Sequence, residues 1–440
     1  MKLRGSRERA SVTVLVLACA LIGPFACAAG DDRTSPTGDD GGSPVDGNVA
    51  TESSMPDAAQ DADAAGDAIV QSHCSSGGFC YYPLPVQKPL SSLSASSVDD
   101  AWAMAEGAIV RWNGTVWSEV HRPPLPPTSG GPVAIWVTKS DDVWALSGGS
   151  LVRYSAKGGG APSFRSFALD SVAFAEVLSL WAAASPSSDA VWVASGVDSV
   201  LRVREAAQGS VDPLEIETML PRSGPDDMDA YTWTHVVGFG PDDVYVAGAV
   251  CPEGFNCRPP RNNADPSGAI AHYDGTGWTI TLRDKPMLAM SKATAPDGAR
   301  RLWLVEGLDP GPLGFGPWDA SLQLVPVADD ASLGAPLVTE ALSISPWGTG
   351  CDHLSVSAAS AERAWLSDGC LVHRWNGSAL ETMPTSIQNV ARGRVNAIWA
   401  ANPDEGWIVG EASPQGAGFP EHTGFAGQRK AEWARDGGQP

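Results

Sequence analysis

The residues of this chain best suited to chemistry are pairs of aspartates that stand close to tryptophans. The stretch "DDAWAMAEGAIVRWNGTVW", residues 99–117, contains two adjacent aspartates and three tryptophans. Two carboxylates can act as a general acid and base, and tryptophans can form a cage around a ligand. A catalytic pair occurs once in a chain, whereas a structural pair recurs. The first question is therefore whether this stretch is repeated.

Related segments do recur, beginning near residues 139, 240 and 360, with more divergent copies near 187, 296 and 402. One aromatic residue after the acidic turn marks each copy: Trp102, Trp144, Trp192, Tyr245, Trp303, Trp365 and Trp407. Successive markers lie 42 to 62 residues apart. Repeats of this length built from short strands indicate a β-propeller.

Each copy can be divided into four strands, with the marker aromatic on the second. We expect the tryptophans to pack in the core and the aspartates to cap backbone N–H groups in turns. The third strand ends in an Asn-Gly or Asp-Gly pair, which predicts a type I′ hairpin turn. These pairs are Asn113-Gly114, Asp274-Gly275 and Asn376-Gly377. The fourth strand then begins with Trp117 or Trp278.

The fold expected for residues 73–440 is all-β, a single β-propeller of four-stranded blades, with seven blades favoured over six or eight. The 48 glycines and 35 prolines agree with short strands joined by tight turns. The last copy ends one strand short, and residues 79–86 ("FCYYPLPV") precede the first complete copy. We expect this segment to supply the missing outer strand and close the ring.

The repeats resemble those of secreted bacterial β-propellers and, more loosely, the Asp-box repeats of sialidases. Asp-box repeats also place an Asp, a Gly and a Trp at the hairpin between the two outer strands. The resemblance covers roughly residues 80–440 and implies a propeller fold. The segment "DGTGW" departs from the Asp-box because it brings Trp278 one residue closer to Asp274. A sialidase would also need three converging arginines and a tyrosine-glutamate pair, and no such set can be identified.

The N-terminal part carries the marks of export. Residues 1–28 combine a basic start with a short apolar run that ends in small residues, which predicts a signal peptide. Cleavage leaves two alternatives open, a lipid anchor on Cys27 of an outer membrane lipoprotein or free secretion. Residues 29–72 are rich in aspartate and poor in large apolar side chains, so we expect a disordered acidic linker.

After cleavage, six cysteines remain in three local couples. An even number of cysteines in an exported chain predicts disulfides. The expected pairs are Cys74 with Cys80, Cys251 with Cys257, and Cys351 with Cys370.

Several functions can be set aside. The net charge of −22 argues against nucleic acid and against simple adsorption to an anionic membrane, so we expect membrane contact only through the lipid anchor. No P-loop, dinucleotide fingerprint, nucleophile elbow or HExxH motif appears, and we expect no cofactor. Neither the cysteines nor His235, His353 and His373 have the spacing of a metal site, and we expect none.

The candidate ligand-binding residues lie in three long insertions, 248–268, 307–319 and 410–428, which strand order places on one face. Two of them supply the aromatic and guanidinium groups Phe255, Arg258, Arg261, Phe315 and Trp318. Such side chains suit a glycan or a protein surface. Two hypotheses follow: a non-catalytic propeller of the cell envelope that presents this face to a glycan or protein, and a polysaccharide-acting hydrolase or lyase with its site in the central mouth.

Overall fold

The structure, a computed structural model, describes residues 73–105, 107–123, 133–147, 150–155, 160–168, 177–183, 190–195, 199–206, 213–221, 229–252, 267–308, 318–344, 354–385, 393–412 and 423–431. The predicted signal peptide, the acidic linker and Cys27 lie outside these residues. All the described residues belong to the unit Asp67–Pro440. Every named element in it is a β-strand, and no helix among the described residues is long and apolar enough to span a membrane.

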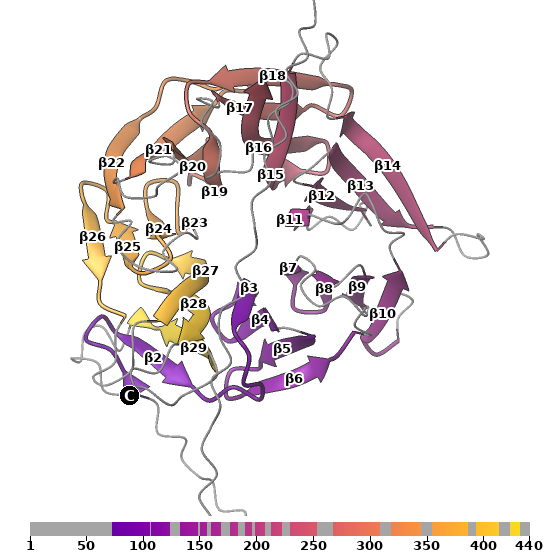
Figure 1. Ribbon diagram of the computed structural model, residues 1–440, viewed down its shortest axis with the longest axis vertical. Helices are drawn as coiled ribbons and strands as arrows, with labels where there is room; N and C mark the ends of the chain where they lie inside the picture. The colour runs from indigo at the N-terminus through magenta and orange to yellow at the C-terminus, as the bar shows by residue number, and fades with distance from the viewer. Residues whose placement is uncertain are drawn as a thin grey trace, which may run out of the picture. The chain divides into compact units, whose positions relative to one another are not determined.

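Seven antiparallel sheets form a ring, with one strand of each nearest the centre (Figure 1). The strands are given from the innermost outward. Blade 1 contains β3 (Leu90–Ser97), β4 (Asp100–Ala105), β5 (Ala108–Trp112) and β6 (Trp117–His121). Blade 2 contains β7 (Val133–Lys139), β8 (Asp142–Ser147), β9 (Ser150–Ser155) and β10 (Ser163–Ala168). Blade 3 contains β11 (Val177–Ala182), β12 (Ala190–Ser195), β13 (Ser199–Glu205) and β14 (Leu214–Pro221). Blade 4 contains β15 (Asp229–Gly240), β16 (Asp243–Pro252), β17 (Ser267–Tyr273) and β18 (Trp278–Arg283).

The remaining blades continue the ring. Blade 5 contains β19 (Met287–Thr294), β20 (Arg300–Leu308), β21 (Trp318–Val327) and β22 (Val338–Ile344). Blade 6 contains β23 (Ser355–Ala358), β24 (Ala364–Ser367), β25 (Val372–Trp375) and β26 (Leu380–Met383). Blade 7 contains β27 (Gly393–Asn402), β28 (Glu405–Ala412), β29 (Thr423–Arg429), β2 (Phe79–Tyr82) and β1 (His73–Cys74). The expected all-β propeller of seven blades is confirmed.

Blade 7 joins the two ends of the domain. Strand β2 pairs with β29, with Tyr81 opposite Gly427, so the N-terminal segment supplies the outer strand that the last repeat lacks, as expected. A disulfide between Cys74 and Cys80 fastens the short β1 to β2. The predicted insertion 410–428 is wrong in part, because β28 continues to Ala412 and β29 occupies Thr423–Arg429.

The marker aromatics form the core between the blades, as expected. Their side chains are 0% or 1% exposed. Each belongs to a hydrophobic cluster that also contains residues of the next blade around the ring. Trp102 of blade 1, for example, packs with Ile135 and Val143 of blade 2. Because burial of apolar area is the main favourable term in folding, these clusters hold adjacent blades together.

Polar side chains also link neighbouring blades. Ser94, Ser291 and Ser357 lie opposite marker tryptophans on innermost strands, and their hydroxyls accept hydrogen bonds from backbone N–H groups of the next innermost strand. The indole N–H groups of Trp303, Trp365 and Trp407 donate to the backbone carbonyl oxygens of Ser360, Pro403 and Val98 in the following blade. These bonds satisfy buried donors and fix the angle between blades.

The turns between third and fourth strands differ from the predicted type I′ geometry. Trp112 pairs with Trp117, so the loop holds four residues, and Gly114 alone of them has positive φ, at 94°. The Asn113 side-chain oxygen accepts hydrogen bonds from the N–H groups of Thr115 and Val116. The Asn-Gly pair therefore marks a hairpin correctly. Its turn is closed by the side chain rather than by two residues with positive φ.

Candidate functional site

The repeated aspartates of blades 1 and 2 form ion pairs within the blades, whereas Asp297 of blade 5 accepts a hydrogen bond from the backbone N–H of Ala299, as expected. Asp100 Oδ1 lies 2.8 Å from Arg111 Nε, and the Arg111 guanidinium lies 4.8 Å from the ring centre of Trp102. Blade 2 repeats this arrangement. Asp142 Oδ1 lies 3.1 Å from Arg153 Nε, and the Arg153 guanidinium lies 4.6 Å from the ring centre of Trp144. Each carboxylate thus holds a cation over the marker ring, which is a structural role.

Blade 4 keeps the aspartate but has different residues at the other two positions. Tyr245 is the marker, His272 lies opposite it on β17, and Asp243 begins β16. The His272 ring stacks on Tyr245 with 4.4 Å between ring centres, and its Nε2 lies 2.9 Å from Asp243 Oδ1. Asp243 also forms an ion pair with Arg300 of blade 5.

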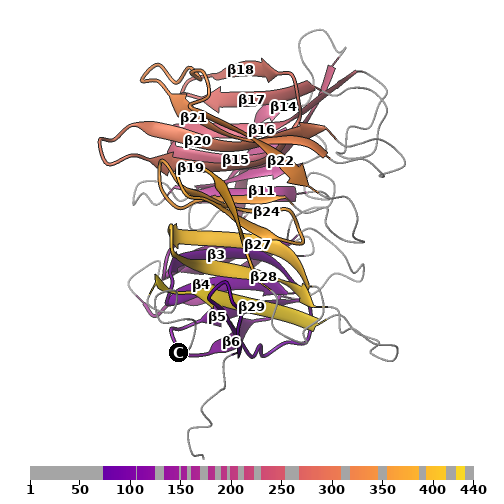
Figure 2. The same cartoon turned by 90° about the vertical axis from the view of Figure 1, so that its left-hand side faces the viewer.

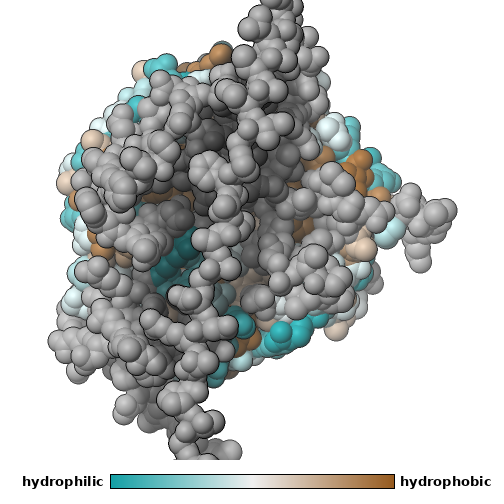
Figure 3. Space-filling view, in the orientation of Figure 1, coloured by the Kyte–Doolittle hydropathy of each residue, from teal (hydrophilic) through white to brown (hydrophobic). Residues whose placement is uncertain are grey.

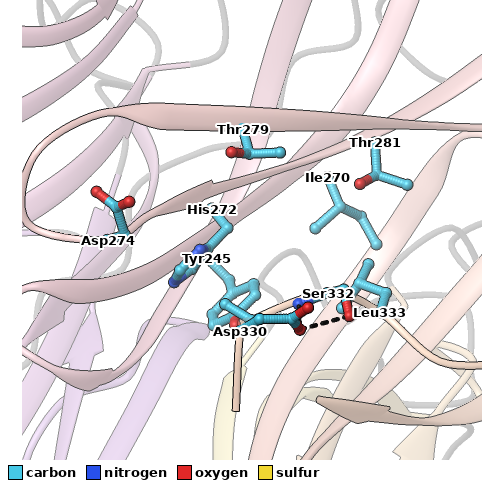
Figure 4. A pocket seen from close by; sticks show the side chains of 10 residues that line it. Tyr245, Ile270, His272, Asp274, Thr279, Thr281, Asp330, Ser332 and Leu333 are labelled. Atoms are coloured by element: carbon cyan, nitrogen blue, oxygen red, sulfur yellow. Dashed lines mark hydrogen bonds between the residues drawn. The ribbon is translucent and has the colours of Figure 1, made fainter. Parts of the chain in front are cut away.

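A cavity of about 260 Å³ opens beside this group, between the β17–β18 hairpin of blade 4 and residues 330–333 of blade 5 (Figure 4). Thr279 and Thr281 of β18 line one side, and Asp330 and Ser332 line the other. Asp274 lies at the hairpin end, and Tyr245 lies between His272 and Asp330. The site is therefore assembled from two repeats.

The two carboxylates of the cavity are ionised at neutral pH. Asp274 accepts hydrogen bonds from the hydroxyl of Thr276 and from the N–H groups of Thr276 and Gly277, which lower its pKa from 3.8 to about 2. Hydrogen bonds from the hydroxyl and N–H of Ser332 lower the pKa of Asp330. A general acid needs a pKa near the working pH, so this pair is suited to binding a cation rather than to proton transfer.

Tyr245 contributes a buried hydroxyl to the cavity. Its side chain is 0% exposed, and among the described residues its hydroxyl has no hydrogen-bond partner. Burial, followed by the charge of Asp243, raises the pKa of Tyr245, so the hydroxyl stays protonated. A buried hydroxyl without a partner is costly, which favours a ligand that would bond to it.

Ala331 adds strain to the cavity wall. With φ of 62°, it is the one non-glycine residue in the described part of the chain that occupies the left-handed region. Two other turns have the same backbone hydrogen-bond pattern, one over residues 75–79 and one over residues 295–299. At the position equivalent to Ala331 they carry glycine, Gly78 and Gly298. Non-glycine residues with such backbone angles occur most often at functional sites.

The predicted ligand-binding residues are only partly covered by the structure. Phe255, Arg258, Arg261 and Phe315 lie outside the described residues. Trp318 does not lie in an insertion as predicted, because it begins β21 and pairs with Ile344 of β22. The predicted insertions 248–268 and 307–319 are shortened in the same way, since β16 continues to Pro252 and β20 to Leu308.

The predicted disulfides and histidines have mixed outcomes. The Cys74–Cys80 disulfide is confirmed. Cys370 is disulfide-bonded, and its expected partner Cys351 lies outside the described residues. Cys257, the expected partner of Cys251, also lies outside them. Cys251 lies on β16 opposite Ala230. His235 lies on β15 beside the Thr234 hydroxyl, His373 lies near Asp368 and Thr382, and His353 is outside the described residues. Among the described residues no group of three metal-ligating side chains is found.

The comparisons with known proteins give resemblances of fold alone. No protein-family model matches the chain, and no curated protein matches it. A streptogramin B lyase structure is 11% identical to this chain, with a TM-score of 0.49. The match covers 80% of this chain and 97% of the lyase chain. YCF48 bound to D1 peptide is 12% identical, with a TM-score of 0.47, and the match covers 80% of this chain and 94% of the YCF48 chain. At these values the activity or ligand of either protein says nothing about this chain.

Sequence reasoning missed the cavity between blades 4 and 5. The departures from the repeat that form it were visible, with Tyr245 in place of Trp and His272 in place of Arg. Nothing in the sequence, however, shows that Asp330 of the next repeat faces them.

Proposed function

We propose that the protein is an exported, non-catalytic propeller that presents one face of the ring to a glycan or protein partner. This face carries the turns between second and third strands. The observation that supports it most directly is the unequal length of the second strands. β16, β20 and β28 have 10, 9 and 8 residues, whereas β4, β8 and β12 have 6 each.

The longer strands precede the three longest stretches of sequence between second and third strands, residues 253–266, 309–317 and 413–422. Hairpin connections commonly have two to five residues, so these stretches are longer than the connection requires. Long loops on a rigid scaffold commonly carry binding residues. Phe255, Arg258, Arg261 and Phe315 lie in the first two, and Trp318 begins the strand after the second.

The absence of catalysis is proposed from the chemistry of the described carboxylates. The repeated aspartates hold arginines in ion pairs, and the carboxylates of the cavity have lowered pKa values. Export is proposed from the N-terminal apolar run, and the Cys74–Cys80 disulfide supports it because such bonds persist in oxidising compartments. Attachment through a lipid on Cys27 and free secretion both remain compatible with this proposal.

The test is a titration of the mature protein with bacterial and host polysaccharides and with envelope protein extracts, followed by tryptophan fluorescence and by analysis of products. We expect saturable binding without cleavage, weakened at least tenfold in R258A/R261A. Arg204→Ala, an exposed arginine on β13, is the matched control and should bind normally. Cleavage products would replace the proposal with the hydrolase or lyase hypothesis. Binding that R258A/R261A leaves unchanged would refute the role of this face.

A further inference from the structure

The outermost strand of blade 4 is the least protected edge in the ring. Sheets end in a strand with free backbone N–H and C=O groups, and charged side chains commonly keep other chains from pairing with it. Charges lie within the outermost strands of the other four-stranded blades, at Glu119, Arg165, Glu215, Glu217, Glu340 and Glu381. β18 reads "WTITLR" and has no charge before its last residue, Arg283. Arg283 is itself bonded to Glu306 of blade 5.

β18 is also exposed and apolar on one side. Ile280 is 39% and Leu282 63% exposed. Figures 1 and 2 show β18 outermost in blade 4, and Figure 3 shows hydrophobic surface at the rim beside it. Trp278, which shares their side of the strand, contacts Trp192 of blade 3. Residues of a strand alternate between its two faces, so Ile280 and Leu282 form an apolar row toward blade 3.

The other row of β18 borders the acidic cavity. Thr279 and Thr281 line it together with Asp274 and Asp330, whose carboxylates are exposed and ionised. The unpartnered hydroxyl of Tyr245 lies in the same cavity and can accept a hydrogen bond from an ammonium group. A strand added to β18 would therefore place alternate side chains over an apolar row and beside two carboxylates.

We propose that the free edge of β18 pairs with an extended segment of a partner protein whose side chains alternate between apolar and cationic. Backbone hydrogen bonds to the edge would supply affinity, and the two rows would supply specificity, as in other cases of strand addition. This surface is separate from the turn-bearing face of the proposed function, and neither depends on the other.

Charge decides between a partner and the protein's own segments. A second copy pairing through β18 would bring two sets of Asp274 and Asp330 close together, which repel. The chain's own residues 29–72 are rich in aspartate and contain one basic residue, Arg33, so they do not match the cavity. A cationic partner segment is the complementary occupant.

The experiment measures the binding of a labelled eight-residue peptide of alternating valine and lysine to the mature protein by fluorescence anisotropy. We expect saturable binding that weakens as salt is added, and at least tenfold weaker binding of a peptide of alternating valine and glutamate. I280K/L282K adds like charge to the edge and should weaken binding of the lysine peptide at least tenfold. L337K, at a residue 57% exposed in blade 5, is its control.

The cavity is tested by a second pair of variants. D274N/D330N should weaken lysine-peptide binding about tenfold and keep the fold, because asparagine caps the corresponding turns at Asn113 and Asn376. D99N/D141N changes the net charge equally at turns of blades 1 and 2, away from the cavity, and should have little effect.

Three results would overturn the proposal. They are no saturable binding of the lysine peptide at millimolar concentration, equal weakening by the test variants and their controls, or a β18-dependent dimer in sedimentation. None of them bears on glycan or protein binding by the turn-bearing face, which R258A/R261A tests separately.

Discussion

Blades 1 and 4 are built on the same repeat but differ in how their polar positions are filled. In blade 1, Arg111 covers Trp102 and pairs with Asp100, and the outer strand β6 carries Glu119. In blade 4, His272 stacks on Tyr245, a cavity lies beside them, and the outer strand β18 is uncharged before Arg283.

The comparison shows how a repeat protein separates folding from binding. The aromatic marker, the glycine of the hairpin and the order of the four strands are retained, and these set the blade. The polar positions are free to change, because the core packing does not depend on them. Binding sites are therefore best sought where a blade departs from its repeat.

The largest expected effect contrasts Trp117 of blade 1 with Trp278 of blade 4. Trp117 is 3% exposed and lies 5.2 Å from Trp407, ring centre to ring centre. Trp117→Ala should lower the free energy of unfolding by about 3–5 kcal/mol. Trp278 is only partly buried, and Trp278→Ala should cost less, about 2 kcal/mol. Urea unfolding measures both; normal stability of Trp117→Ala with lost ligand binding would show that the tryptophans form a site.

A second contrast lies in β15, which is longer than β3 and contains the partly buried His235. Burial lowers the pKa of His235 from 6.5 to about 4. The folded state therefore favours neutral His235, and its stability should be full above pH 6.5 and fall as the pH drops toward 4. The expected loss is about 1–3 kcal/mol. Urea unfolding at several pH values checks this, and His235→Gln should flatten the profile; an equally steep profile in this variant would contradict the assignment.

The strained turn beside the cavity gives a smaller effect. Ala331→Gly should raise the free energy of unfolding by about 1 kcal/mol, because glycine adopts positive φ without steric cost. Gly298→Ala in the corresponding turn of blade 5 should lower it by a similar amount. Thermal unfolding of the two variants tests this, and a destabilised Ala331→Gly would mean that the Ala331 methyl group makes contacts that outweigh the strain.

The smallest effect compares Asp274 with its counterpart Asn113. The lowered pKa of Asp274 means that its turn contributes stability above pH 3.8, which is lost as the pH falls toward 2. Asp274→Asn keeps the acceptor oxygen and should remove this part of the acid dependence. The thermal midpoints of the unmodified protein and of Asp274→Asn, measured between pH 2 and 5, should therefore differ in their dependence on pH. The same dependence on pH in both proteins would contradict a contribution from these turn hydrogen bonds.

Some of the site could be read from the chain and some could not. The seven markers predict the blades because each lies in a short segment whose strands and turns are specified locally. The turn type was wrong, because Asn113, Asp274 and Asn376 satisfy N–H groups with their side chains and need no positive φ themselves. The capping role expected of the aspartates is confirmed for Asp297 and wrong for Asp100 and Asp142, because their partners, Arg111 and Arg153, lie across the sheet rather than in the turn.

The sequence by itself determined the repeat, the burial of the marker aromatics and the strand that closes the ring, and it favoured seven blades over six or eight. These follow from local patterns of apolar and turn-forming residues, which recur seven times. Only the tertiary structure decided that Tyr245 and Asp330, 85 residues apart, share one cavity. It also decided that β18, which has no charged side chain before Arg283, is the edge strand of its sheet. Such features depend on how neighbouring blades meet, and the contacts across a blade interface leave no periodic signal in the chain.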